Sequence, residues 1–180
     1  MQRTLVIGSQ DSDHIWGSEL ARIELIEYGD FQCPHCIEAH ASIKFLRKSL
    51  VPQIRFIYRH FPLTAIHQSA TRASVFAEAA GRQDRYWEMF DYLFENPTLI
   101  PDFETSGLAE TLSLNPRQFA EDCNDPALMS KILNDHETGH QMGVTGTPSL
   151  FINGVPFKQH INLPGLLNAC SEILLKEGGL

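Results

Sequence analysis

Basic residues are scarce in this chain. Its 180 residues include 14 Lys and Arg against 22 Asp and Glu, which gives a formal charge of −8, and no run of basic residues occurs. Sequence-independent binding to nucleic acid requires phosphate neutralisation, and docking on an anionic membrane requires a basic patch. The composition therefore argues against binding to nucleic acid and to the surface of a membrane.

Long apolar runs are missing as well. No segment approaches the roughly 20 apolar residues that cross a bilayer. The apolar stretch Leu5-Val6-Ile7 is too short for the core of a signal peptide, and no A-x-A cleavage site follows it. We therefore expect a cytoplasmic protein, or a periplasmic one if the chain is a trimmed mature form, which would show the same pattern.

Only four cysteines are present, and only Cys33 and Cys36 are close in sequence, within YGDFQCPHCIEAH at residues 28–40. This fits a stapled disulfide framework poorly. Zinc prefers four ligands, usually from two such pairs, and here only His40 could add a third ligand. A metal site is thus disfavoured. A redox-active pair and a passive buried pair both remain possible interpretations of Cys33 and Cys36.

Hydrophobic periodicity predicts the structure around this pair. Residues 22–28 and 53–58 alternate as strands do, and residues 34–50 follow a helical period between them, which makes a βαβ unit. Residues 149–152 and 155–157 predict a hairpin around Asn153-Gly154, and an amphipathic helix follows.

Between these parts the chain shows helical patterns and no strand signal. The patterns predict helices over 66–80, 86–94, 102–112, from 116 and from 126 to about 142, with Asn115 and Asp125 as caps. The fold class is therefore α/β, with residues 1–63 and 143–180 as the sheet-containing domain and residues 64–142 as a helical insertion.

The expected position of Cys33 at a helix start has a chemical consequence. Free N–H groups and the helix dipole favour an anion there, so the Cys33 thiolate forms readily and can attack a disulfide. Pro34 needs no N–H partner and stiffens the loop, and His35 adds a positive neighbour. Cys36, one turn inside the helix, is expected to be buried and to act as the resolving sulfur.

A second feature is the segment GVTGTPS at residues 143–149. A Thr-Pro step directly before a strand is unusual, because proline cannot donate to a sheet ladder. A cis Thr147–Pro148 bond would suit a tight loop there, and an ordinary trans turn is also consistent with the sequence.

Together these segments resemble the DsbA-like branch of the thioredoxin superfamily. DHIWG, EYGDFQCPHC, RHFPL, FAEAAGRQDRYWEMFDYLFEN and GVTGTPSLFINGVPF occur in that family's order and cover nearly the whole chain. The resemblance implies a thioredoxin-like fold with an inserted helical subdomain. It also implies a thiol–disulfide oxidoreductase that works through a mixed disulfide without metal or organic cofactor, on thiol or disulfide proteins or glutathione.

The resemblance also implies roles for individual residues. Cys33 would be the nucleophile, Cys36 the resolving cysteine, and Pro148 a cis proline that faces them. Thr147 would offer backbone hydrogen bonds to an extended substrate peptide. Glu27 would lie under the second cysteine and help to move its proton, although a solvated strand residue is an equal alternative from the sequence.

Two rival functions remain. Kappa-type glutathione transferases and isomerases share the architecture but lack the CxxC pair, and a chaperone-like peptide-binding module would carry its cysteines incidentally. Cys123 and Cys170 fall on apolar helix faces, so we expect both to be buried and to pack as hydrophobic side chains. The segment HETGH at 136–140 matches the letters of a zinc-protease motif, but we expect Gly139 to interrupt the helix that such a site requires.

Overall fold

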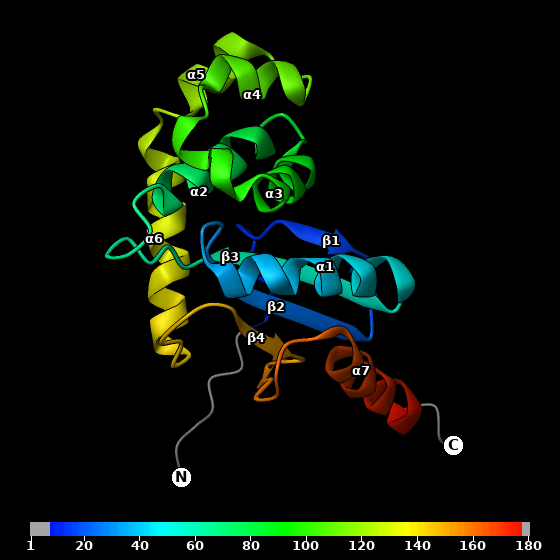
Figure 1. Cartoon of the computed structure of the whole chain (residues 1–180). Coiled ribbons are helices and arrows are strands. Elements are labelled where there is room, and N and C mark those ends of the chain that lie inside the picture. The colour runs from blue at the N-terminus through cyan, green and yellow to red at the C-terminus, as the bar shows by residue number, and fades with distance from the viewer. Residues whose placement is uncertain (1–7, 178–180) are drawn as a thin grey trace.

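A mixed five-stranded sheet lies at the centre of the computed structural model, which describes residues 8–177 (Figure 1). The strand order is β1-β3-β2-β4-β5. The stretch Leu5-Val6-Ile7 and the outermost ends of the predicted sheet-containing domain lie outside the described residues. Within 8–177, every helix is too short or too polar to span a bilayer.

Two parallel strands, β2 (Ile23–Gly29) and β3 (Ile54–His60), form the middle of the sheet. All of β2 is buried, as is typical of parallel strands that are covered on both faces, and both strands are rich in β-branched and aromatic residues. The register places Gly29 opposite His60, so the two strands end together at one edge of the sheet. The predicted βαβ unit is confirmed.

Three shorter strands complete the sheet. β4 (Ser149–Ile152) pairs antiparallel with β2, and β5 (Val155–Pro156) forms the predicted hairpin with β4. β1 (Ile15–Gly17) pairs antiparallel with β3 and was not predicted, because three residues are too few to show an alternating pattern.

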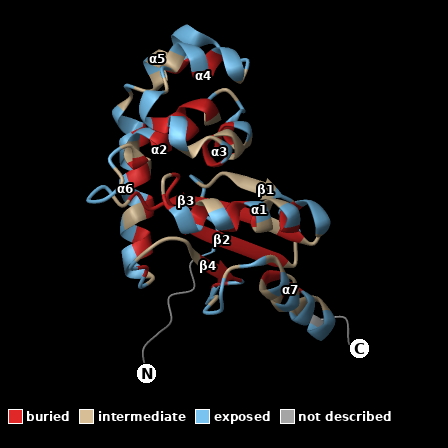
Figure 2. Cartoon of the chain, viewed as in Figure 1, coloured by how far each residue is buried: buried red, intermediate tan, exposed pale blue. Residues whose placement is uncertain are grey.

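Helices cover both faces of the sheet. α1 (Pro34–Ser49), α3 (Tyr86–Glu95) and α7 (Leu163–Glu177) contribute to the larger buried cluster, on the face where Glu27 lies. α6 (Pro126–Gln141) packs against β3 on the opposite face. Figure 2 shows buried residues along the strands and on the inner sides of these helices. The predicted aromatic stripe of α3 is core, as expected.

Only helices occur between β3 and β4, as predicted. In chain order they are α2 (Ala70–Gly81), α3, the 3-10 helix η1 (Pro97–Asp102), α4 (Thr105–Thr111), α5 (Pro116–Asp122) and α6. The predicted caps are confirmed: Asn115 Oδ1 accepts from the Gln118 N–H at 3.1 Å, and Asp125 Oδ1 accepts from the Ala127 N–H at 2.8 Å.

Two of the predicted helix starts were wrong. Helix α2 begins at Ala70 rather than at Ile66, which is 70% exposed. Hydrogen bonds to the backbone N–H groups of Leu63 and Ser69 hold that segment against the end of β2 and keep it out of the helix. The helix predicted from Asp102 is preceded by η1, whose internal Pro101 separates it from α4.

The helices α2 to α5 lie above the sheet in Figure 1. Buried residues of α2 and α3 belong to the same hydrophobic cluster as those of β2, β3 and α1. The domain boundaries at residues 63 and 143 stay a prediction.

The expectation that Gly139 interrupts a helix was wrong. α6 runs through it, and the glycine permits a close approach between helix and sheet. A Cβ at this position would lie 2.8 Å from the Phe61 ring and 3.0 Å from the Tyr28 ring. Gly139 is therefore a packing residue. Glycine has a low helix propensity, and the close packing of two aromatic rings against this position offsets that cost.

A Gly139→Ala substitution should destabilise the protein by about 1–3 kcal/mol, because the new methyl group overpacks this contact. Urea unfolding followed by circular dichroism measures the change. Gly107→Ala in α4 is the matched control, since no atom lies within 4 Å of the place that its Cβ would take, and it should stabilise the helix by up to about 1 kcal/mol. A stabilised Gly139→Ala protein would contradict the packing role.

Candidate active site

The loop between β2 and α1 is held by Asp30, a buried carboxylate that the sequence analysis missed. Its Oδ1 accepts from the Gln32 N–H at 2.7 Å, and its Oδ2 accepts from the Leu63 N–H at 2.8 Å. The same Oδ2 lies 2.8 Å from His67 Nδ1. The backbone carbonyl of Asp30 accepts from the Cys33 N–H, so this residue fixes the entry to α1. Its sequence signal is the Gly-Asp step at the strand end, which is typical of a turn.

Cys33 occupies the N-cap of α1, and Pro34 is the first helical residue, as predicted. Hydrogen bonding with Cys36, Thr147 and the backbone of Cys36 and His35 lowers the pKa of Cys33 from 9.0 to about 5, against the opposing effect of burial. The residue is only 4% exposed. A thiolate at neutral pH is the form that attacks disulfides.

Cys36 lies one turn inside α1 and is fully buried, as predicted. Burial raises its pKa well above 9.0, and the hydrogen bond with Cys33 and the nearby Glu27 raise it further. The two sulfurs therefore differ in protonation at pH 7, although they are hydrogen-bonded to one another. All four cysteines of the chain are free thiols in the structure.

The Thr147–Pro148 bond is cis, as the sequence analysis suggested, and it lies beside the redox pair. Cys33 Sγ donates to the Thr147 carbonyl at 3.3 Å. That bond belongs to the thiol form of Cys33. In the thiolate form, the buried Thr147 hydroxyl, which has no other hydrogen-bond partner among the described residues, is the Thr147 group that can donate to the sulfur and lower its pKa. A second cis bond, Val51–Pro52, lies between α1 and β3 and was not predicted.

Glu27 is buried on β2, with 2% exposure, and is not a solvated strand residue. Burial raises its pKa from 4.5 to about 8; Arg47 acts in the opposite direction, and Cys33 adds to the increase. A carboxyl with a pKa near neutrality can both accept and donate a proton. The structure thus brings Glu27 into the same buried environment as the cysteine pair.

Arg47 of α1 is a second residue that sequence reasoning missed. Its buried guanidinium lies 5.2–5.4 Å from the centroids of four aromatic rings, and its Nη2 donates to Asp91 Oδ1 at 2.9 Å. The charge lies near enough to lower the pKa of Glu27. The four rings are those of Trp16, Phe56, Trp87 and Phe90.

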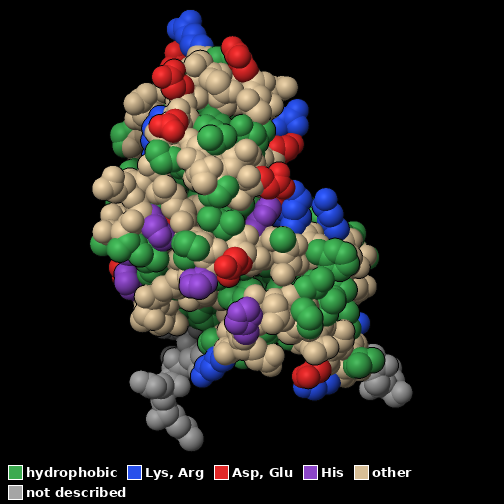
Figure 3. Space-filling view, in the orientation of Figure 1, with side chains coloured by type: hydrophobic (Ala, Val, Ile, Leu, Met, Phe, Trp, Pro, Cys, Tyr) green, Lys and Arg blue, Asp and Glu red, His purple; other side chains and the backbone are tan. Residues whose placement is uncertain are grey.

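His35 points to solvent, with 78% of its side chain exposed, and lies 3.6 Å from Glu38. It borders an open pocket of about 320 Å³ next to the cis proline. On the face of the molecule that Figure 3 shows, histidine side chains are visible at several separate places. The pocket is lined by His35, Glu38, Thr147, Pro148, Gln159, His160 and Ile161. It therefore adjoins both halves of the candidate site.

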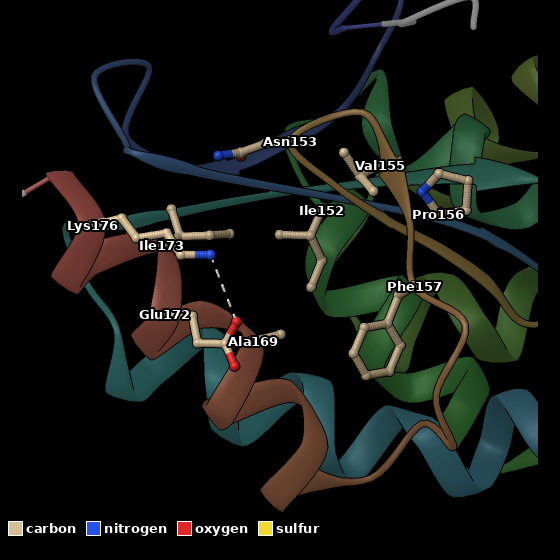
Figure 4. Close-up of a pocket in the computed structure, with 9 residues that line it drawn as sticks. All are labelled: Ile152, Asn153, Val155, Pro156, Phe157, Ala169, Glu172, Ile173 and Lys176. Carbon is tan, nitrogen blue, oxygen red and sulfur yellow. Dashed lines mark ion pairs between the residues drawn. The ribbon is translucent and has the colours of Figure 1, made fainter.

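A separate apolar pocket of about 390 Å³ lies between the β4–β5 hairpin and α7 (Figure 4). In that view the rings of Phe157 and Pro156 and the chains of Ile152 and Ile173 surround it, and the Glu172–Lys176 ion pair lies on α7. None of the predicted site residues lines this pocket.

Other candidates from the sequence are not brought into a site. His136 stacks on Phe61 and His140 packs edge-on to it, on the opposite face of the sheet, and His40 forms a hydrogen bond with Asp91. Cys170 is buried, as predicted, and Cys123 is half-buried. Within the described chain, no cluster of three or more His, Cys, Asp or Glu side chains could hold a metal ion.

Comparison with protein families decides the relationship. A family model described as thioredoxin matches residues 9–170. The chain belongs to the thioredoxin family. Solved DsbA-type structures share the fold over 89–93% of the chain, which confirms the predicted fold class.

Two of these structures show the extent of the similarity. Alpha-DsbA1 of Wolbachia pipientis is 22% identical, with a TM-score of 0.79 over 93% of this chain and 94% of that one. Oxidised BdbD of Bacillus subtilis is 19% identical, with a TM-score of 0.75 over 89% and 92%.

Curated relatives carry a different name. The Na(+)/H(+) antiporter NhaA 1 of Salinispora arenicola is 37% identical over 162 residues, which make up 90% of this chain and 25% of that protein. The antiporter NhaA 1 of Mycolicibacterium vanbaalenii is 31% identical over 88% of this chain and 26% of that protein. This thioredoxin-family chain thus spans about a quarter of the length of the curated relatives it matches.

Alkylation of the reduced protein by iodoacetamide should titrate with a midpoint near pH 5, because the pKa of Cys33 is lowered to about 5. The rate at each pH, with mass spectrometry to locate the adduct, measures this midpoint. Since the folded pKa is depressed, Cys33 contributes stability to the reduced protein that is complete above pH 9 and is lost as the pH falls through 5.

The matched comparison is Cys33→Ser, which removes this contribution together with the effect of the Cys33 charge on Glu27. The difference in unfolding free energy between the reduced wild type and this variant should decrease from pH 9 to pH 5. A midpoint near 9 would contradict the hydrogen-bonded thiolate.

Proposed function

We propose that this chain is a thiol–disulfide oxidoreductase that acts through a mixed disulfide at Cys33. The observation that carries the proposal is the opposite environment of the two sulfurs at the start of α1. The pKa of Cys33 is lowered and that of Cys36 is raised, so one sulfur is ready to attack while the other keeps its proton.

The proposed reaction has two steps. The Cys33 thiolate attacks a substrate disulfide, forms a mixed disulfide and releases one substrate thiolate. Cys36 then loses its proton to Glu27 and attacks the Cys33 sulfur, which forms the Cys33–Cys36 disulfide and releases the second substrate thiolate. The substrate is reduced and the protein pair is oxidised; the reverse sequence oxidises a substrate dithiol.

The surroundings of Cys33 support an extended peptide as the substrate. The cis Thr147–Pro148 loop lies against the sulfur, and its backbone is the expected hydrogen-bond partner of the peptide. The neighbouring open pocket offers both polar and apolar groups, from His160 to Ile161. Pro34 and His35 would stiffen the loop and favour the thiolate.

The alternatives fit less well. The function of a kappa-type glutathione transferase or isomerase does not explain why a second cysteine, Cys36, is buried beside Cys33. The function of a chaperone-like module does not explain why the pKa of Cys33 is lowered. Turnover of insulin disulfides, and its loss in Cys33→Ser, separates the oxidoreductase from the chaperone-like module. Glutathione conjugation to an electrophile that survives in Cys36→Ser would instead favour the transferase.

The curated relatives suggest a partner rather than a second activity. Because the match covers a quarter of those antiporters, we propose thiol chemistry for this chain, not ion transport, and a membrane transporter as one candidate substrate protein. The expected cytoplasmic location stays a prediction, which fractionation of cells that express the full-length protein from its own gene would test.

A Cys36→Ser variant should accumulate mixed disulfides, because the first step remains and the second is removed. Incubation with glutathione disulfide, followed by acid quenching and intact-mass spectrometry, should show a glutathione adduct at Cys33. Cys33→Ser should show little adduct, and Cys170→Ser, which removes a buried thiol outside the site, should behave as the wild type. Equal trapping in both CPHC variants would defeat the assignment of roles.

The Cys33–Cys36 disulfide should be more oxidising than that of thioredoxin. Only the reduced protein has a thiolate to stabilise, so the lowered pKa of Cys33 favours reduction. Equilibration with glutathione buffers measures the potential. A potential at or below that of thioredoxin would reject the oxidant direction and leave the oxidoreductase proposal standing.

A further inference from the structure

The segment between β3 and α2 is tied to the loop that carries the redox pair. Asp30 Oδ2 accepts the Leu63 N–H and lies 2.8 Å from His67 Nδ1. A separate hydrogen bond runs from the Ser69 N–H to Gln32 Oε1 at 2.7 Å. Both loop residues come directly before the reactive cysteine in the chain. A segment more than thirty residues away in sequence is therefore fastened to the entrance of α1.

Asp30 contacts both cysteines through its main chain. Its carbonyl accepts from the Cys33 N–H at 3.1 Å. Burial raises the pKa of Cys36, and a hydrogen bond with the backbone of Asp30 acts in the opposite direction. Any displacement of Asp30 therefore changes the surroundings of both sulfurs at once.

The carboxylate of Asp30 depends on His67 for its only side-chain donor among three hydrogen bonds. The Asp30 side chain is fully buried, and that of His67 is 16% exposed. Oδ1 accepts the Gln32 N–H and Oδ2 accepts the Leu63 N–H, so both oxygens act as acceptors, as in an ionised carboxylate. His67 Nδ1 therefore carries the hydrogen of the third bond and donates it to Oδ2. This donor, unlike the two backbone groups, can be removed by substitution.

Loss of the His67 donor would leave a buried charge with one partner fewer. A hydrogen bond to an ionised group is roughly twice as strong as one between neutral groups, and a buried charge is costly unless it is paired. Asp30 would then have to move toward water, and the loop residues bonded to its side chain and carbonyl would move with it.

We propose that His67 is a positioning residue of the redox site, which acts through Asp30 to hold the Cys33 thiolate in its hydrogen-bonded place at the start of α1. The proposal rests on the oxidoreductase function. Its consequence is that the segment after β3, although it carries neither cysteine nor the cis proline, controls how readily the reactive thiolate forms.

The proposal makes two measurable quantities change together. Hydrogen bonding with Cys36, Thr147 and the backbone of His35 keeps the pKa of Cys33 low, at about 5, and a displaced loop weakens these bonds. Each unit by which this pKa rises toward 9.0 disfavours the reduced protein about tenfold at pH 7, because only the reduced protein contains the thiolate. A general loss of stability would not produce this correspondence.

His67→Leu is the direct test, because it removes the donor and keeps an apolar side chain of similar bulk. The midpoint of Cys33 alkylation by iodoacetamide should rise by about one pH unit. In glutathione buffers at pH 7, the equilibrium should shift about tenfold toward the Cys33–Cys36 disulfide.

Two conservative variants separate the donor from the shape of the ring. The amide nitrogen of asparagine is as many bonds from Cα as His67 Nδ1, so His67→Asn should restore the wild-type midpoint and equilibrium. The amide nitrogen of glutamine lies one bond further, in the place of Nε2, so His67→Gln should shift both quantities as His67→Leu does.

His14→Leu is the matched control. It removes another contact between an imidazole and a buried carboxylate, since His14 Nε2 lies 3.0 Å from Glu78 Oε2, outside the loop that carries the cysteines. This variant should lose stability in urea unfolding and keep the wild-type midpoint of Cys33 alkylation.

Three results would overturn the positioning role: a wild-type midpoint and equilibrium in folded His67→Leu and His67→Gln, an equal shift in His67→Asn and His67→Gln, or an equal shift in His14→Leu. If His67→Leu does not fold, the comparison of the asparagine and glutamine variants decides. A wild type that forms no adduct with glutathione disulfide would reject the oxidoreductase proposal, whereas the alkylation midpoints, which need no turnover, still decide the role of His67.

Discussion

The parallel pairing of β2 with β3 is the constraint on which the site depends. It places the ends of both strands at one edge of the sheet, where Asp30 ties the loop before α1 to the segment after β3. Cys33 is therefore held at the start of a helix by a strand register and a single buried carboxylate. The antiparallel β4 then brings Thr147, two residues before its first strand residue, against the same sulfur.

From this arrangement the two sulfurs acquire opposite properties. Cys33 gains hydrogen bonds at the helix N-terminus, which favour its anion, while Cys36 is one turn further into a core that disfavours any charge. The same core raises the pKa of Glu27, and Arg47 limits that rise. The pKa of Glu27 near neutrality is thus a consequence of its burial between β2 and α1.

The sequence predicted the parts of this site that depend on local pattern. The alternation of β2 and β3, the helix after Pro34, the two capped helices and the Asn153-Gly154 turn are readable because each follows from neighbouring residues. The prediction that Pro148 faces Cys33 came from the resemblance of the CPHC and GTP segments to the DsbA-like family. No local pattern in the sequence contains that information.

The features that the sequence did not reveal are contacts between distant segments. β1 is too short to have a period, and Asp30 matters because Leu63 and His67 return to it after β3. Gly139 looked like a helix breaker, although its role is set by two rings of the sheet. In the same way, nothing near Tyr58 in sequence shows that its hydroxyl fills the space above Gly29.

Buried polar groups occur on both faces of the sheet. On the α6 side, Arg59 is fully buried and bonds Asp13, the Tyr28 hydroxyl and the Gly8 carbonyl. On the α1 side, Glu27, Tyr58 and His60 each retain an unpaired atom. The buried charge of Arg59 is thus balanced by direct partners, whereas the buried carboxyl of Glu27 responds to burial with a pKa raised to about 8, which is the property that lets it exchange a proton with Cys36 in the proposed reaction.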